Sequence, residues 1–430
     1  MPENEIVYQI YPLGLCGAPA RNDGILIHRI TCLHRWISHL KKLHVTTVLF
    51  NPLMQSLSHG YDTTDFKTVD VRLGDVNDLQ EVCRALHEAG FRIWFDGVFN
   101  HVGRNFKPFQ DVLAHRRESR FRDWFYIDFQ NADCEDGLTY ADWEGHHELV
   151  RLNLQNPAVR DELFSVVDNW IETYAIDGLR LDVAYCLDES FLRSLCAHVK
   201  TRHSQFMFVG ECIHGDYNRL LSIVDSVTNY ECYKGLWSSF NSRNLFEIGY
   251  SLHRQFGNEP WCLYTGKRLL SFADNHDVTR LASILKDARD LPLAYSLLSA
   301  MPGIPAYYYG SEWGTLGEKG KADDQALRPA VDTPQWNDLT TTIAALNQLR
   351  TDHDALQNGS YQEVIKRNEQ WGFLRQNENE TILYLLNCAD ENCTVELPAY
   401  EQMIDLLNGD RIVDRFLTVK AKQFLFLQCR

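Results

Sequence analysis

Short apolar runs alternate with helical stretches through most of the chain. Eight runs have the length and residue types of buried strands, and they are EIVYQIYP, VTTVLFNP, FRIWFDGVFNH, DGLRLDV, FMFVGEC, SVTNYE, LLSFADNHD and IPAYYYG. Apolar residues recur at helical spacing over 33–43, before the second run, and over 79–89, before the third. Eight strand and helix units in succession predict an α/β fold, a closed (β/α)₈ TIM barrel rather than an open sheet.

Two segments interrupt this alternation. Residues 103–150 are polar and aromatic and exceed an ordinary connection in length, so we expect a short excursion over one mouth of the barrel. From residue 358 the helical period gives way to short strands separated by turn residues, which predicts a C-terminal antiparallel β domain like a β-sandwich. The expected organisation is a barrel over 1–357, including the excursion, followed by the β domain over 358–430.

The fourth run carries two charges on one face. Side chains of a strand alternate between its faces, so Arg180 and Asp182 point one way while Leu179, Leu181 and Val183 point the other. Burying these charges is unfavourable unless they pair or bond to other groups. At this point a structural ion pair and a catalytic carboxylate, its pKa held down by the neighbouring guanidinium, both remain open.

Polar residues also end other strands of the expected barrel. The polar and charged residues that interrupt these apolar runs lie at the C-terminal ends of the strands, where barrel enzymes have their active sites. They are Asp96, Asn100, His101, Arg180, Asp182, Glu211, His276 and Asp277. This convergence favours a catalytic site over an isolated ion pair. Glycosidic cleavage needs one carboxylate as nucleophile or base and one acid that protonates the leaving oxygen. Arg180 would keep Asp182 ionised, and the apolar run before Glu211 favours a protonated acid there.

Composition narrows the class of substrate. The formal net charge is −16 and no Lys/Arg-rich run occurs, which argues against nucleic acid or an anionic membrane as partner and fits a neutral substrate. No window approaches the roughly 18 apolar residues that span a bilayer. Twelve cysteines are scattered without CxxC spacing, and the start MPENEIVYQIYP lacks a signal-peptide pattern. We therefore expect reduced thiols and a cytoplasmic location.

Four motifs carry a family resemblance. In this order, DGVFNH, GLRLDVAYC, FVGEC and FADNHD resemble the main conserved blocks of the α-amylase family of retaining glycoside hydrolases, family thirteen. The resemblance covers about residues 5–330. It implies that Asp182 is the nucleophile, Glu211 the general acid/base, and Asp277 the acid that binds sugar hydroxyls and stabilises the transition state. It also implies a substrate-binding set: Tyr61, Asp96, His101, Arg180, His276 and Arg328.

Some of these assignments leave alternatives open. For Arg328, in DDQALRP, a solvated loop charge is the alternative to substrate binding. The resemblance implies no cofactor, but Asn100 matches a position that binds calcium in many family members. The excursion shows no acidic calcium-loop spacing, so calcium is the less favoured reading.

Further motifs favour one branch of the family. SRFRDWFYI, ELVRLNLQNPAVR and AMPGIPAYYYGSEWG look most like intracellular cyclomaltodextrinases, neopullulanases and maltogenic amylases. The leading hypothesis is hydrolysis of α-1,4-glucosidic bonds in malto-oligosaccharides or cyclodextrins, and the alternative is a transglycosylase of the same family. A non-catalytic binding or scaffold member is a third hypothesis, disfavoured because all three acids are present. That branch usually carries an N-terminal β domain that helps it dimerise, whereas here the first expected strand begins near residue 6, so a homodimer stays open.

Overall fold

Eight parallel strands form one closed sheet. The computed structural model describes residues 4–130, 137–320, 324–400 and 402–429. Its parallel strands are β1 (Val7–Ile10), β2 (Thr47–Phe50), β5 (Arg92–Gly97), β11 (Gly178–Leu181), β12 (Met207–Gly210), β13 (Ser226–Val227), β14 (Leu270–Phe272) and β15 (Ile304–Tyr308). They are ordered β13-β12-β11-β5-β2-β1-β15-β14, and a parallel bridge from Thr228 to Leu270 joins the two ends. The predicted barrel is confirmed, and each of the eight expected runs contains one strand of the barrel.

Alternation along the strands separates an inner core from an outer one. Leu49, Trp94 and Val209 belong to the inner core that fills the barrel. Leu179 and Leu181 of β11 belong to the outer core against the helices. Arg180, between them, therefore faces the interior, as the alternation predicted.

Helices cover the outside of the barrel. The longer helices of the chain are α3 (Val76–Glu88), α4 (Lys107–His115), α5 (Pro157–Tyr174), α6 (Glu189–Lys200), α8 (Tyr230–Ser242), α9 (Phe246–Phe256), α11 (Leu291–Ala300) and α12 (Asp338–Asp352), of which α4 belongs to the excursion and not to the barrel. The shorter ones are α1 (Pro12–Leu15), α2 (Ile37–Lys42), α7 (Asn218–Leu221), α10 (Leu281–Ile284) and α13 (Asp354–Asn358). The first predicted helix is in part a 3₁₀ helix, Arg29–Trp36, which continues into α2.

A tight turn joins helix α5 to strand β11. Helix α5 ends at Tyr174, and Ala175 takes the left-handed conformation, φ 55°. Gly178 already belongs to β11, where an added Cβ would lie 2.6 Å from the ring of Trp94. Position 178 therefore requires glycine because two strands approach each other closely, and not because a helix ends there.

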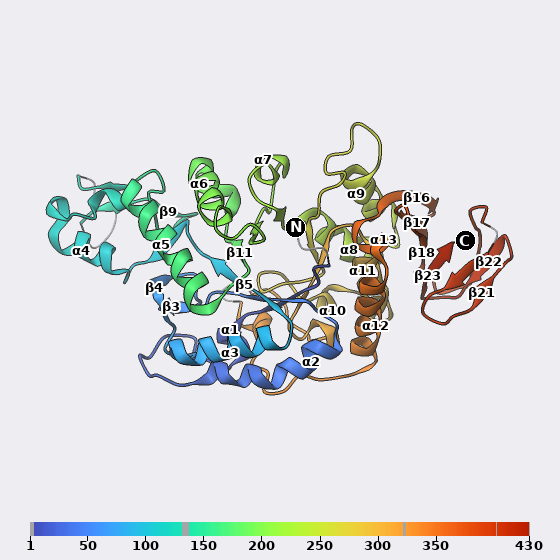
Figure 1. Cartoon of the computed structure of the whole chain (residues 1–430), viewed down its shortest axis with the longest axis horizontal. Coiled ribbons are helices and arrows are strands. Elements are labelled where there is room, and N and C mark those ends of the chain that lie inside the picture. The colour runs from blue at the N-terminus through green and yellow to red at the C-terminus, as the bar shows by residue number, and fades with distance from the viewer. Residues whose placement is uncertain (1–3, 131–136, 321–323, 401, 430) are drawn as a thin grey trace.

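The excursion is a small subdomain at one end of the molecule (Figure 1). Strand β6 (His101–Gly103) pairs antiparallel with β10 (His146–Arg151), and β9 (Asp142–Trp143) is the third strand. It also holds α4 and the pair β7 (Ile127–Asp128) and β8 (Thr139–Tyr140). A second hairpin, β3 (Met54–Ser56) with β4 (Thr63–Val69), follows β2 and was not predicted.

The C-terminal β domain lies at the opposite end of the long axis (Figure 1). Its main sheet has the order β16-β17-β18-β23-β20-β21, and β19 pairs with β22. The strands are β16 (Ser360–Lys366), β17 (Gln370–Gln376), β18 (Thr381–Asn387), β19 (Cys393–Glu396), β20 (Met403–Asp405), β21 (Arg411–Ile412), β22 (Phe416–Val419) and β23 (Gln423–Cys429). The antiparallel domain is confirmed, although β21 and β22 were not predicted.

Two global properties concern the described residues. Their helices include none long and apolar enough to cross a membrane. The eleven cysteines among them carry no disulfide, and the twelfth, Cys134, lies outside the described residues.

Candidate active site

Arg180 lies at the centre of a buried cluster of charges at the mouth of the barrel. Its Nη1 donates to both carboxylate oxygens of Asp96, at 2.8 and 2.9 Å, and to Oδ1 of Asp182 at 2.8 Å. Its Nη2 lies 2.6 Å from Oε1 of Glu211. The register sets these contacts, since Arg180 is paired with Asp96 on β5 and Glu211 directly follows β12. One guanidinium therefore serves three acids, and all four residues are at most 5% exposed.

The electrostatics of Asp182 differ from the expectation. Burial raises the pKa of Asp182 well above its ordinary value, Arg180 opposes this shift, and Glu211 and Asp96 add to it. The ion pair with Arg180 is present, but the predicted net lowering of this pKa is wrong because burial outweighs the single cation. A buried cluster with more carboxylates than cations favours retention of a proton, the state that an acid and nucleophile pair requires.

Glu211 is held by the turn that follows β11. Val183 has φ 39° and ψ 44°, a left-handed conformation that is rare for a β-branched residue. The backbone N–H of Val183 donates to Oε2 of Glu211 at 2.9 Å, and the hydroxyl of Tyr230 lies 3.3 Å from Oε1. The strand alternation that we expected to reach Val183 ends at Leu181, and the turn supplies a hydrogen-bond donor to the acid instead.

Asp277 is the most open of the three proposed catalytic acids, with 32% of its side chain exposed. Its Oδ2 lies 3.0 Å from Nε2 of His276 and its Oδ1 lies 3.1 Å from Nη2 of Arg328. Burial alone would raise the pKa of Asp277, but His276, Arg328 and Arg180 together hold it below its ordinary value. Arg328 stacks on the ring of Tyr11 at 4.6 Å, so it lies at the site and is not a solvated loop charge.

Tyr61 connects the two halves of the cluster. Its hydroxyl donates to Oδ2 of Asp96 at 2.9 Å and is also hydrogen-bonded to Nε2 of His276. The rings of Tyr61 and His276 stack at 5.6 Å with an angle of 7°. Asn51 donates to both Tyr61 and Asp96 at 3.0 Å. The ring of Tyr61 is thus fixed in orientation before any ligand binds.

The comparison with known proteins agrees with this geometry. A sequence profile of the alpha amylase catalytic domain matches residues 23–354. The chain belongs to the alpha-amylase family. It is 29% identical over 425 residues to a cyclomaltodextrinase of Bacillus sp, covering 90% of this chain and 73% of that protein. It is 28% identical over 388 residues to neopullulanase 2 of Thermoactinomyces vulgaris, covering 87% of this chain and 66% of that protein.

A solved structure extends the likeness to the whole fold. A cyclomaltodextrinase structure superposes with a TM-score of 0.87 at 28% identity, over 99% of this chain and 78% of that one. The predicted family is therefore confirmed. The chain spans 73% of the Bacillus relative and 66% of the Thermoactinomyces relative.

His101 has one ring nitrogen that makes no hydrogen bond with the described residues. The residue is 2% exposed, and its Nε2 has no hydrogen-bond partner among the described residues. Burial lowers the pKa of His101 to about 3, so the ring is neutral at physiological pH. The ring lies 5.9 Å from that of Trp143. A buried, neutral and unpartnered imidazole nitrogen fits a hydrogen bond to a ligand hydroxyl.

Asn100 makes contacts with His101 and Leu152. Its side-chain amide nitrogen lies 3.2 Å from Nδ1 of His101, and its backbone carbonyl oxygen accepts from the N–H of Leu152 at 3.0 Å. Calcium takes six to eight oxygen ligands, and these contacts of Asn100 with described residues supply no carboxylate. Calcium therefore stays a prediction, and no step below depends on it.

Three further residues complete the site and were missed from the sequence. Gln9, in β1, donates to Asn51 at 2.9 Å and lies 3.0 Å from Nδ1 of His276. Asn51 directly follows β2, and Tyr230 follows β13. The signal for Gln9 and Asn51 was available, because each is a polar residue at the C-terminal end of an apolar run, as Asp96 is.

Proposed function

We propose that this chain hydrolyses α-1,4-glucosidic bonds of malto-oligosaccharides and cyclomaltodextrins with retention of configuration. One observation carries the proposal: Asp182 and Glu211, from neighbouring strands, bond to the two terminal nitrogens of the same guanidinium. Their carboxyl groups are consequently close, as in retaining glycosidases, where the separation is about 5–5.5 Å rather than roughly 6.5–9.5 Å. The relatives named cyclomaltodextrinase and neopullulanase support the substrate class.

Each acid has a defined part in the proposed reaction. The Asp182 carboxylate attacks the anomeric carbon while the Glu211 carboxylic acid gives its proton to the leaving glycosidic oxygen. A glycosyl ester on Asp182 results. Glu211, now ionised, takes a proton from water as the water oxygen attacks the same carbon, which frees Asp182. Val183 and Tyr230 hold Glu211 in position for both proton transfers.

The remaining residues of the site bind the sugar. The ionised Asp277 accepts hydrogen bonds from sugar hydroxyls, with Arg328 and His276 fixing its orientation. The ring of Tyr61 offers an apolar face to the C–H groups of one sugar. Nε2 of His101 is available for one further hydroxyl.

The direct test follows the anomeric proton by NMR during hydrolysis of maltohexaose and γ-cyclodextrin. The α-anomer is expected first, and initial release of the β-anomer would contradict the proposal. We expect a higher kcat/KM for maltotriose to maltohexaose and for cyclodextrins than for starch. A large ratio of transfer to hydrolysis products at high substrate concentration would favour the transglycosylase instead, and no turnover on any α-glucan would favour a binding protein.

Three predictions accompany this function. They are a cytoplasmic location, the absence of a cofactor, and a homodimer as an open alternative to a monomer. Sedimentation of the purified full chain with and without maltohexaose distinguishes the two oligomeric states.

A further inference from the structure

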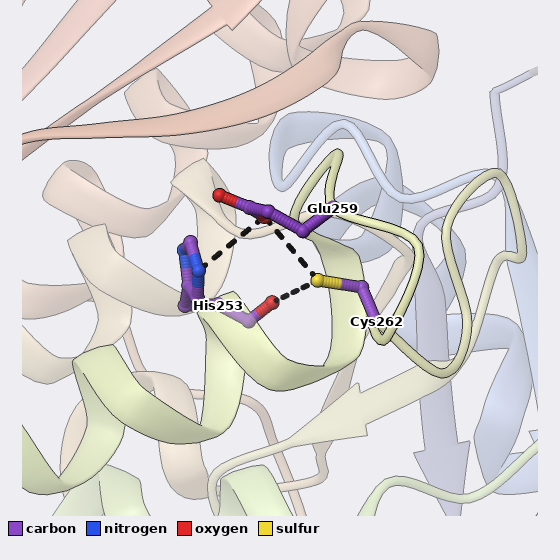
Figure 2. Close-up of side chains that lie close together, drawn as sticks. All are labelled: His253, Glu259 and Cys262. Atoms are coloured by element: carbon purple, nitrogen blue, oxygen red, sulfur yellow. Dashed lines mark hydrogen bonds and ion pairs between the residues drawn. The ribbon is translucent and has the colours of Figure 1, made fainter.

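Three side chains of different chemistry converge after helix α9. His253 lies in the last turn of α9, and Glu259 and Cys262 lie in the loop that follows; Figure 2 shows their side chains directed toward one another. Nε2 of His253 is 3.4 Å from Oε2 of Glu259, and the same oxygen is 3.4 Å from Sγ of Cys262. The three donor atoms all lie within 4.8 Å of one another.

The backbone holds these atoms in place. The N–H of Cys262 donates to the carbonyl of Glu259 at 2.9 Å, and the N–H of Leu263 donates to the carbonyl of Arg254 at 2.9 Å. Gly257 leaves the space that the cluster needs, since a Cβ there would lie 2.7 Å from both Sγ of Cys262 and Oε2 of Glu259. The loop is therefore folded so that an imidazole, a carboxylate and a thiol face one small volume.

Two donor separations in the cluster match a tetrahedral metal site. Zinc binds sulfur at about 2.3 Å, imidazole nitrogen at about 2.0–2.1 Å and carboxylate oxygen at about 2.0–2.2 Å, so tetrahedral donors are about 3.3–3.6 Å apart. Both 3.4 Å separations in the cluster lie in this range. A mixed nitrogen, oxygen and sulfur donor set is also typical of zinc rather than of calcium or magnesium.

We propose that His253, Glu259 and Cys262 bind one Zn²⁺ ion, with water as the fourth ligand. The Glu259 side chain is 46% exposed, which gives solvent access for the ion and for that water. As the zinc–sulfur bond forms, the Cys262 thiol releases its proton to solvent. The hydrogen bond that this thiol donates to the carbonyl of His253, at 3.2 Å, is then lost. The bound ion fixes the loop against α9 ahead of β14, the strand that leads to Asp277.

A second cluster of possible ligands serves as a contrast. His28, Asp75 and Asp78 also lie close together, but the two carboxylates already cap helix α3. Oδ1 of Asp75 accepts from the N–H groups of Asn77 and Asp78, and Oδ2 of Asp78 accepts from the N–H of Asp75 at 2.8 Å. Binding an ion there would compete with the cap, so we assign no metal to it.

The test uses the full chain after removal of metal with a chelator. Calorimetric titration with Zn²⁺ alone is expected to show one ion per chain, and Co²⁺ is expected to give the intense visible bands of a tetrahedral site with a thiolate charge-transfer band. Cys262→Ser and Glu259→Gln should each weaken Zn²⁺ binding by at least about tenfold. Zn²⁺ should raise the melting temperature of the natural chain but not of Cys262→Ser.

Matched controls make each outcome decisive. His28→Ala removes the competing cluster, and Cys393→Ser removes a partly exposed thiol elsewhere; both should bind Zn²⁺ like the natural chain. Equal affinity of Cys262→Ser and the natural chain, or loss of binding in His28→Ala, would overturn the proposal. If Cys262→Ser melts early without metal, Glu259→Gln, at a half-exposed position, gives the same decision. No readout depends on hydrolysis, so failure here leaves the proposed function untouched.

Discussion

Replacing Arg180 by Met removes the one cation shared by three buried acids. The guanidinium lies 2.6–2.9 Å from oxygens of Asp96, Asp182 and Glu211, and Arg180 is 4% exposed. Met is unbranched and apolar but shorter than Arg, so the change removes the charge, the hydrogen bonds and the volume of the guanidinium group. Removing one partner of a buried ion pair destabilises a protein by about 3–5 kcal/mol. With three dependent carboxylates, we expect the upper half of this range at neutral pH.

The loss should depend on pH with a definite sign. Burial already raises the native pKa of Asp182 above its unfolded value of about 3.9, and loss of the Arg180 cation raises it further. A carboxyl whose pKa is raised by folding binds its proton more tightly in the native state. Ionisation of this carboxyl therefore destabilises the folded state at high pH. The destabilisation disappears as the pH falls towards the pKa of the carboxyl in the unfolded state. The destabilisation by Arg180→Met should therefore be larger at about pH 7.5 than at about pH 5.

Urea unfolding followed by tryptophan fluorescence measures the difference in free energy at both pH values. Arg202→Met is the control, because Arg202 is 56% exposed and pairs with Asp168 at 3.3 Å. This control should change the free energy of unfolding by at most about 1 kcal/mol at either pH. A loss below about 1 kcal/mol for Arg180→Met at pH 7.5, or the same loss at both pH values, would refute the reasoning.

Further substitutions separate chemistry from stability. Asp182→Asn should abolish turnover yet raise the melting temperature at about pH 7.5, with a gain that shrinks towards pH 4, because it removes a buried charge whose pKa is raised; residual kcat above a few per cent would place the nucleophile elsewhere. Glu211→Gln should still release fluoride from glycosyl fluorides in the first turnover, because that leaving group needs little protonation, while losing maltohexaose hydrolysis; loss of this fluoride release as well would contradict its role as acid. Tyr61→Phe keeps the ring but removes the bond to Asp96, so kcat/KM should fall by about ten- to hundredfold; an unchanged kcat/KM would show the hydroxyl to be irrelevant. Cys212→Ser should lower the melting temperature with little change in kcat, since Cys212 is 2% exposed and packs in the core; the reverse pattern would show a role in catalysis.

The fold and most of the site were predictable for one physical reason. A strand buried on both faces consists of apolar residues, so a polar residue at its C-terminal end, such as Asp96 or Glu211, stands out in the sequence. Closure of the barrel then brings these strand ends together, so the barrel fold alone is enough to predict that they form one site. The same reasoning applied to β1 and β2 would have found Gln9 and Asn51.

The features that were missed depend on three-dimensional detail. The left-handed turn at Val183 contradicts the preference of a β-branched residue and exists because the surrounding site enforces it. The pKa of Asp182 depends on how many carboxylates share Arg180 and how deeply they are buried, which no spacing reveals. The contact of Arg328 with Asp277 joins two loops that are distant in sequence. Strand β21 has 2 residues and β22 has 4, and Val419 is the one residue of these two strands that is buried.

The covalent intermediate tests the central claim most directly. Glu211→Gln should form the glycosyl ester from α-maltosyl fluoride but break it down slowly, because it lacks the base that activates water. Peptide mapping by mass spectrometry after rapid acid quench should then locate one maltosyl group on Asp182, within the tryptic peptide 181–193. A maltosyl group on Asp277 or on any other residue, or product formation with no labelled peptide, would contradict the assignment of Asp182 as the nucleophile.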